Sequence, residues 1–128
     1  MVKRAVILGY DAVSPLGTDM ETQWENAAGG KSGIGPLTRF PLTDEFPVRI
    51  AGQVGEWDAS PYPFLSPRKL AQWASPIFKH AMLVTHRALL KSGVEITAEV
   101  APRTAVTFSS AVGGQDAVLA ADRRMIRE

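Results

Sequence analysis

The sequence predicts an α/β fold built in layers. Three runs have the composition of β-strands, three have the spacing of helices, and strands and helices alternate along the chain. Alternation of this kind predicts helices packed against a sheet. The 128 residues contain no internal repeat or low-complexity tract, and they have the length of one domain.

The first predicted strand is residues 5–8, Ala-Val-Ile-Leu, a continuous apolar run that Gly9 ends. A run without polar alternation is typical of a central strand covered on both faces. Thr18 and Glu21 have the spacing of a capping box, which predicts that the first helix begins there. Glycines at 29–30 predict its end, because glycine accepts the backbone conformation that closes a helix.

Residues 31–47 are rich in Gly and Pro without periodicity and predict a surface loop. Residues 48–54 alternate with period two, which predicts a half-buried strand. Residues 68–92 form the longest helical stretch, but Pro76 cannot donate to the preceding turn. We therefore expect a kink or two segments, the second capped by Ser75. Its apolar positions at helical spacing are expected to face the core: Ile77, Ala81, Val84, Ala88 and Leu89.

The last part of the chain predicts one more strand and one more helix. Gly93 is expected to end the long helical stretch. Residues 103–109 include a run rich in β-branched and aromatic side chains and predict the third strand. A turn at Gly113 and Gly114 then leads into a helix over 115–128.

Composition excludes several functional classes. The 14 basic and 13 acidic side chains form no extended Lys/Arg stripe, so we expect no nucleic-acid partner. No apolar run approaches the roughly 18 residues of a membrane span, and the N-terminus has no secretory core, so we expect a cytoplasmic protein without a membrane partner. The absence of cysteine excludes disulfides, thiolate metal sites and a cysteine nucleophile within these residues.

The chain offers few candidate catalytic groups. Ser109 and Ser110 lack the flanking glycines of a nucleophile elbow. His80 and His86 are six residues apart, about 240° around a helix, and cannot share a metal ion. We therefore expect no catalytic residue, no metal site and no cofactor within residues 1–128.

Arg68 and Lys69 stand together at the start of the long helical stretch. Such a pair is either an ordinary solvated face or a small patch that docks a phosphorylated or acidic partner. The sequence pattern alone leaves both interpretations open.

The order of several short motifs is more informative than any one of them. The motifs are 4–9 Arg-Ala-Val-Ile-Leu-Gly, 12–17 Ala-Val-Ser-Pro-Leu-Gly, 24–26 Trp-Glu-Asn, 30–36 Gly-Lys-Ser-Gly-Ile-Gly-Pro, 39–40 Arg-Phe, 46–52 Phe-Pro-Val-Arg-Ile-Ala-Gly, 89–94 Leu-Leu-Lys-Ser-Gly-Val and 109–114 Ser-Ser-Ala-Val-Gly-Gly. In this order they resemble the N-terminus of the β-ketoacyl-acyl-carrier-protein synthases, of the synthase II type. The resemblance covers essentially the whole chain.

The resemblance implies a thiolase-like layered fold, of which residues 1–128 would be an incomplete portion: the N-terminal part of the first αβαβα half. It also implies a cytoplasmic homodimer that performs decarboxylative Claisen condensation of an acyl thioester with malonyl-acyl carrier protein, in fatty-acid or polyketide synthesis. In that family a cysteine thiolate carries the acyl group, and two histidines and an oxyanion hole stabilise developing charge. His80 and His86 match neither family histidine, so the chain alone is expected to be inactive.

The resemblance also assigns site residues. Val112 matches an apolar position at the acyl-chain pocket, and Gly113 and Gly114 would let the backbone turn close to that pocket. Arg68 and Lys69 match the basic start of a helix that helps to dock the acidic acyl carrier protein. Two alternatives stay open: a non-catalytic partner subunit resembling the chain-length factors, and a small self-sufficient α/β binding module.

Overall fold

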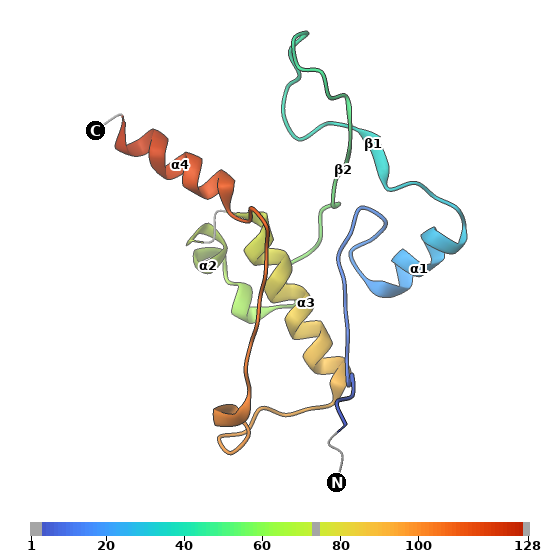
Figure 1. Cartoon of the computed structure of the whole chain (residues 1–128), viewed down its shortest axis with the longest axis vertical. Helices are drawn as coiled ribbons and strands as arrows, with labels where there is room; N and C mark the ends of the chain where they lie inside the picture. The colour runs from blue at the N-terminus through green and yellow to red at the C-terminus, as the bar shows by residue number, and fades with distance from the viewer. Residues whose placement is uncertain (1–3, 73–74, 127–128) are drawn as a thin grey trace. The chain divides into compact units, whose positions relative to one another are not determined.

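The computed structural model describes residues 4–72 and 75–126, which fall into two compact units. One unit comprises residues 11–58; the other combines the N-terminal residues up to Tyr10 with the chain from Ala59 onward. Among the described residues, no helix is both long enough and apolar enough to cross a membrane. Each unit is described separately below, with the labels of Figure 1.

The unit of residues 11–58 contains helix α1 (Met20–Ala28) and two short antiparallel strands, β1 (Ile34–Pro36) and β2 (Ile50–Gly52). The strands pair in the register Ile34 with Gly52 and Pro36 with Ile50. Helix α1 ends at Gly29 as predicted. The predicted strand over 48–54 is confirmed only at its centre, and β1 lies inside the stretch predicted to be a loop.

The start of α1 differs from the prediction by one residue. Asp19, and not Thr18, is the N-cap: its carboxylate accepts a hydrogen bond from the Thr22 N–H at 2.8 Å. A second carboxylate oxygen accepts from the Thr22 hydroxyl at 2.9 Å. A carboxylate can accept both bonds at once, which favours Asp19 over the neighbouring hydroxyl as the cap.

The second unit is mainly helical. Its elements are the 3₁₀ turn η1 (Pro63–Leu65), α2 (Pro67–Gln72), α3 (Pro76–Ser92), the 3₁₀ turn η2 (Ala101–Arg103) and α4 (Gln115–Met125). The division at Pro76 is confirmed, as is the stop at Gly93, which has a φ of 66°. Ser75 occupies the predicted N-cap position, but its side chain makes no capping hydrogen bond. Positions 73–74 and 127–128 of the predicted helices lie outside the described residues.

The core of this unit is small. Leu83 is fully buried at 0% exposure, and Leu65 and Ser75 are each 2% exposed. The predicted buried face of α3 was wrong in detail, because Leu83 was not among its members and Leu89 is 38% exposed. Spacing along one helix does not show which face the neighbouring segments cover, so the apolar pattern did not identify Leu83.

The predicted strands at 5–8 and 103–109 are wrong for the described part of the chain, where neither run belongs to a strand. Figure 1 shows residues 5–8 and 104–109 as extended segments that run in one direction, opposite to α3, whereas Arg103 belongs to η2. Ile7 is 85% exposed and Val106 is 81% exposed. A strand requires a neighbouring segment to accept and donate its backbone hydrogen bonds, and the described residues supply no such neighbour to either run.

Candidate functional site

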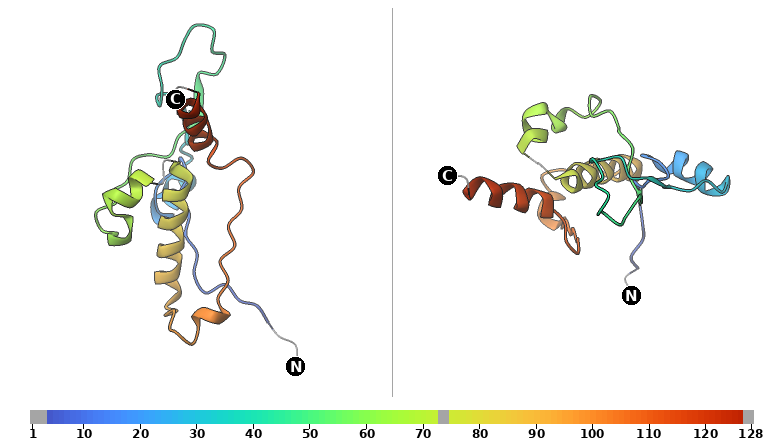
Figure 2. Two further views of the ribbon diagram at one scale, coloured as in Figure 1. Left: turned by 90° about the vertical axis from the view of Figure 1, so that its left-hand side faces the viewer. Right: turned by 90° about the horizontal axis from the view of Figure 1, so that it is seen from above.

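The glycine turn before α4 packs tightly against the start of α3. A Cβ atom added at Gly113 would lie 2.5 Å from the Ser110 Oγ and 2.8 Å from the Ile77 Cδ1, so no side chain fits there without movement. Gly114 is the N-cap of α4, with a φ of 82° that glycine adopts at least cost. Figures 1 and 2 show α4 beginning beside the first turn of α3.

Val112 directly precedes this turn and is 68% exposed. Its side chain is therefore not enclosed by the residues that the structure describes. The close approach of the backbone at Gly113 is observed. The acyl pocket that Val112, Gly113 and Gly114 would line stays a prediction.

Arg68 and Lys69 lie on the short helix α2, and both side chains are exposed. Helix α2 follows η1 after a single residue, Ser66, and contacts it. The structure therefore displays the two predicted docking residues together on one solvent-facing segment. Their docking role stays a prediction.

A cluster of aromatic and basic side chains ties η1 to α3, and the sequence analysis missed it. The Arg87 Nε donates a hydrogen bond to the Tyr62 hydroxyl at 2.9 Å, and its guanidinium carbon lies 5.6 Å from the Tyr62 ring centroid. The His86 ring meets Tyr62 edge-on at 5.8 Å and Phe64 at 4.6 Å. We call Tyr62, Phe64, His86 and Arg87 the aromatic clamp.

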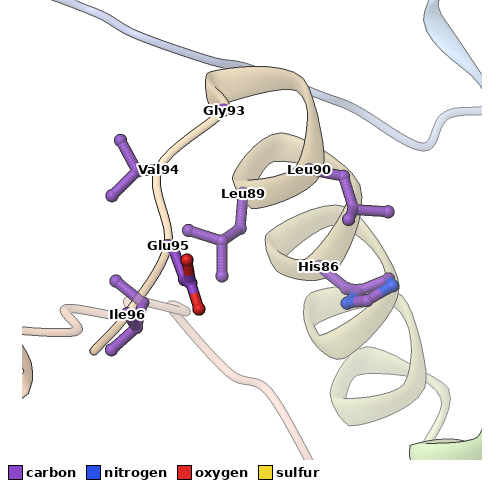
Figure 3. Close-up of a pocket in the computed structure, with 7 residues that line it drawn as sticks. All are labelled: His86, Leu89, Leu90, Gly93, Val94, Glu95 and Ile96. Carbon is purple, nitrogen blue, oxygen red and sulfur yellow. The ribbon is translucent and has the colours of Figure 1, made fainter. Parts of the chain in front are cut away.

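A hollow of about 380 Å³ lies at the C-terminal end of α3 (Figure 3). Leu89 points from the helix toward the segment after Gly93, which carries Glu95 and Ile96. The lining is largely apolar, and its ionisable groups are Glu95 and His86. It contains no hydroxyl or thiol that could act as a nucleophile, so it offers no catalytic set.

A larger apolar groove of about 630 Å³ follows α3 within the same unit. Its walls are the two extended runs, the outer face of α3 and the segment that joins α3 to η2. The lining residues are Val6, Ile7, Leu8, Gly9, Thr85, Ala88, Leu89, Ser92, Val94, Ile96, Val100, Thr104 and Val106.

Comparison with known proteins places this arrangement in a family. Residues 3–127 match the family model described as "Beta-ketoacyl synthase, N-terminal domain". The chain belongs to the β-ketoacyl synthase family. The resemblance found in the motif order is thereby confirmed.

Curated relatives of this β-ketoacyl synthase segment carry the name 3-oxoacyl-(acyl-carrier-protein) synthase 2. The protein of Coxiella burnetii (strain RSA 493 / Nine Mile phase I) is 35% identical over 112 residues, which are 88% of this chain and 26% of that relative. The protein of Vibrio harveyi is 31% identical over 126 residues, 98% of this chain and 29% of the relative. That of Staphylococcus aureus (strain COL) is 29% identical over 124 residues, 97% and 29% respectively. The chain thus spans less than a third of the length of these relatives.

The described residues of this synthase segment bring no metal-binding group together. No three His, Asp or Glu side chains in the described ranges gather closely enough to hold an ion. Both histidines are on α3 and half-buried, and His86 belongs to the aromatic clamp. The features that remain for function are the glycine turn, the basic pair on α2 and the aromatic clamp.

Proposed function

We propose that this chain is the N-terminal part of a β-ketoacyl-acyl-carrier-protein synthase. The observation that carries the proposal is the family match over residues 3–127, supported by the shared name of the curated relatives. The synthase condenses an acyl thioester with malonyl-acyl carrier protein in fatty-acid synthesis, or in a polyketide pathway. It acts as a homodimer, and its catalytic residues come from a part of the protein other than residues 1–128.

In the proposed reaction, the acyl group first moves from its carrier thioester to an enzyme thiolate, and the carrier thiol leaves. Loss of carbon dioxide from the malonyl thioester leaves a carbanion at the adjacent carbon. That carbanion attacks the enzyme-bound acyl carbonyl, a carbon–carbon bond forms, and the enzyme thiolate is released. The product is a 3-oxoacyl thioester on the carrier protein.

The proposed complete fold is a thiolase-like layered arrangement in which both extended runs are sheet strands. Support comes from their direction, since residues 4–10 and 104–110 run parallel to each other and opposite to α3 (Figure 1). Two parallel strands joined through a helix have this geometry. Support also comes from exposure, because Val6, Ile7 and Val106 are each more than 70% exposed on an apolar groove. Strands covered on both faces are apolar in this way.

The experiment that tests the function uses the product of the complete reading frame that contains residues 1–128, assayed beside the Vibrio harveyi relative. We expect 3-oxoacyl-carrier-protein product and release of carbon dioxide from malonyl-carrier protein. A complete protein that binds carrier protein but does not catalyse the condensation would overturn the proposal in favour of a chain-length-factor-like subunit. A complete protein that neither condenses nor binds a carrier would overturn it in favour of a small α/β binding module.

Arg68 and Lys69 are proposed to dock the acidic carrier protein. Their support is exposure together on α2 and the charge of the expected partner. Reversing both charges, Arg68→Glu with Lys69→Glu, should weaken binding of acyl carrier protein to the complete protein by about tenfold or more, largely through slower association.

The matched control for docking is Arg123→Glu with Arg124→Glu, which changes net charge equally in the last turn of α4. Equal losses in both double variants would mean general charge attraction and would remove the docking role from Arg68 and Lys69. Surface plasmon resonance at two salt concentrations separates the two outcomes.

Val112 is proposed to limit the length of the acyl chain. Val112→Phe should shift selectivity of the complete synthase toward shorter acyl chains, because a ring fills space that a longer chain needs. Val118→Phe is the matched control, since Val118 is 67% exposed on α4. Unchanged chain-length selectivity for Val112→Phe would remove Val112 from the pocket.

A further inference from the structure

We propose that the aromatic clamp of Tyr62, Phe64, His86 and Arg87 positions α2 for the carrier protein. The inference rests on the proposed docking role of Arg68 and Lys69. Tyr62, His86 and Arg87 are positioning residues, because they act on the partner through the segment that carries the basic pair.

Helix α2 cannot hold its own position. It is six residues long, and isolated helices shorter than about 12 residues are marginal in water. It begins with Pro67, and Pro76 starts the next helix, so α2 does not continue into α3 as one rigid rod. The direction in which Arg68 and Lys69 are presented therefore depends on what holds η1, the turn that α2 contacts.

The clamp holds η1 from one side. The Arg87 Nε reaches the Tyr62 hydroxyl at 2.9 Å across 25 residues of sequence, and the bond is partly buried. A hydrogen bond from a guanidinium is charge-assisted and stronger than a neutral one, and the adjacent ring face adds a cation–π contact at 5.6 Å.

Within η1 the clamp is continuous with the core. The Leu65 N–H donates to the Tyr62 carbonyl at 2.8 Å, and the Tyr62 N–H donates to the Ala59 carbonyl at 3.0 Å. Leu65 itself is 2% exposed. Tyr62 therefore joins the backbone turn to Arg87 of α3, and it stands three residues before the buried Leu65 and six before Arg68.

The arrangement divides the basic residues of this region by role. Arg87 contacts Tyr62 and is half-buried, whereas Arg68 and Lys69 are exposed. We assign Arg87 to holding the segment and the pair on α2 to meeting the partner. A purely electrostatic patch would not need an aromatic partner for one of its cations.

The test removes one hydroxyl. In the complete protein, Tyr62→Phe keeps the ring and removes the hydroxyl that accepts from the Arg87 Nε. Amide hydrogen exchange of peptides covering 62–72 should quicken by about tenfold, the change expected for losing a bond to a charged group. Binding of acyl carrier protein should weaken as well. Tyr10→Phe, at the chain's other tyrosine, is the matched control and should change neither quantity.

Exchange at 62–72 that is equal in the wild type and in Tyr62→Phe would overturn the proposal, whether both are protected or both are fully exposed. A conservative replacement supplies a rescue: His86→Phe keeps a ring against Tyr62 and Phe64 and should retain protection, whereas His86→Ala should lose it. Loss of protection in both His86 variants would also count against the clamp.

Failure of this inference is distinguishable from failure of the docking proposal. Arg68→Glu with Lys69→Glu should weaken carrier binding without changing exchange at 62–72. If that double variant binds normally, the docking role fails. If it binds weakly while Tyr62→Phe binds normally despite faster exchange, docking stands and the positioning role fails.

Discussion

Different kinds of interaction stabilise each of the two units internally. Within residues 11–58 no side chain is fully buried, and polar side chains bond to backbone instead. The Asn26 Nδ2 donates to the Leu16 carbonyl at 2.6 Å, and the Gln23 Nε2 donates to the Ala12 carbonyl at 2.8 Å. In the other unit, Leu65 and the α3 residue Leu83 are buried, while large apolar side chains of both extended runs are exposed.

The difference shows which interactions this segment completes by itself. The bonds from Gln23 and Asn26 join residues 11 and 10 positions apart, so these two donors find their acceptors nearby in the chain. Apolar side chains on a strand cannot be buried by residues nearby in the chain in this way, because the strand face has to pack against a second layer of helices or strands. The helical unit therefore has a small core beside an open apolar groove.

The largest effect on stability is expected at Leu83, which is fully buried in the helical unit. Leu83→Ala removes the one large side chain at 0% exposure among the described residues and should lower the free energy of opening of α3 by about 3 kcal/mol. Native-state hydrogen exchange of α3 peptides measures it. Leu90→Ala, in the same helix at 67% exposure, should change it by less than about 0.5 kcal/mol. Equal losses in the two variants would show that Leu83 is not a core residue.

A smaller but still clear effect is expected at Gly9, where the first extended run approaches α3. A Cβ added there would collide with the Ala88 carbonyl oxygen and lie 2.8 Å from the Ser92 backbone nitrogen. Backbone atoms of a helix cannot rotate away, so Gly9→Ala should cost about 2 kcal/mol and release this run from the helix. We expect faster amide hydrogen exchange at residues 4–10 and at the end of α3.

Gly55→Ala is the control for Gly9→Ala, because an added Cβ there meets nothing within 4 Å. Protection at the end of α3 that survives Gly9→Ala would mean that the run does not lie against the helix in solution. The two variants together test whether the first extended run and α3 both line the groove in solution.

The same contrast explains what the sequence could predict. Ser75, Pro76 and Gly93 act within one or two turns of chain, and the bounds of α3 followed from them. The runs at 5–8 and 103–109 have strand composition, but pairing depends on segments that composition does not locate. Propensity alone therefore predicted strands that have no ladder among the described residues.

The candidate site divides in the same way. The tight turn at Gly113 and Gly114 was visible in the sequence, because adjacent glycines before a helical pattern indicate close backbone packing. The aromatic clamp was not visible, since the Tyr62 hydroxyl and its Arg87 donor are 25 residues apart. Arg87 had the same appearance in the sequence as any cation on a solvated helix face.

The smallest effect is expected at Gln53. This residue directly follows β2, and its side chain bonds to the last residue of β1 and to the segment after it. Its Oε1 accepts from the Thr38 and Arg39 N–H groups at 3.2 and 3.1 Å, and its Nε2 donates to the Pro36 carbonyl at 2.9 Å. These bonds are exposed, so water replaces part of what is lost. Gln53→Ala should therefore destabilise the hairpin by only about 1 kcal/mol, measured by exchange of the Thr38 and Arg39 amides.

Gln53→Glu distinguishes the accepting oxygen of this side-chain amide from its donating nitrogen. A carboxylate still accepts from Thr38 and Arg39, but it cannot donate to Pro36 and places negative charge beside that carbonyl oxygen. If accepting is what matters, the two amides stay protected in Gln53→Glu and lose protection in Gln53→Ala. If both variants lose protection equally, the donor to Pro36 sets the hairpin. If neither does, strand pairing alone holds it, and the unit of residues 11–58 depends less on side-chain hydrogen bonds than its geometry indicates.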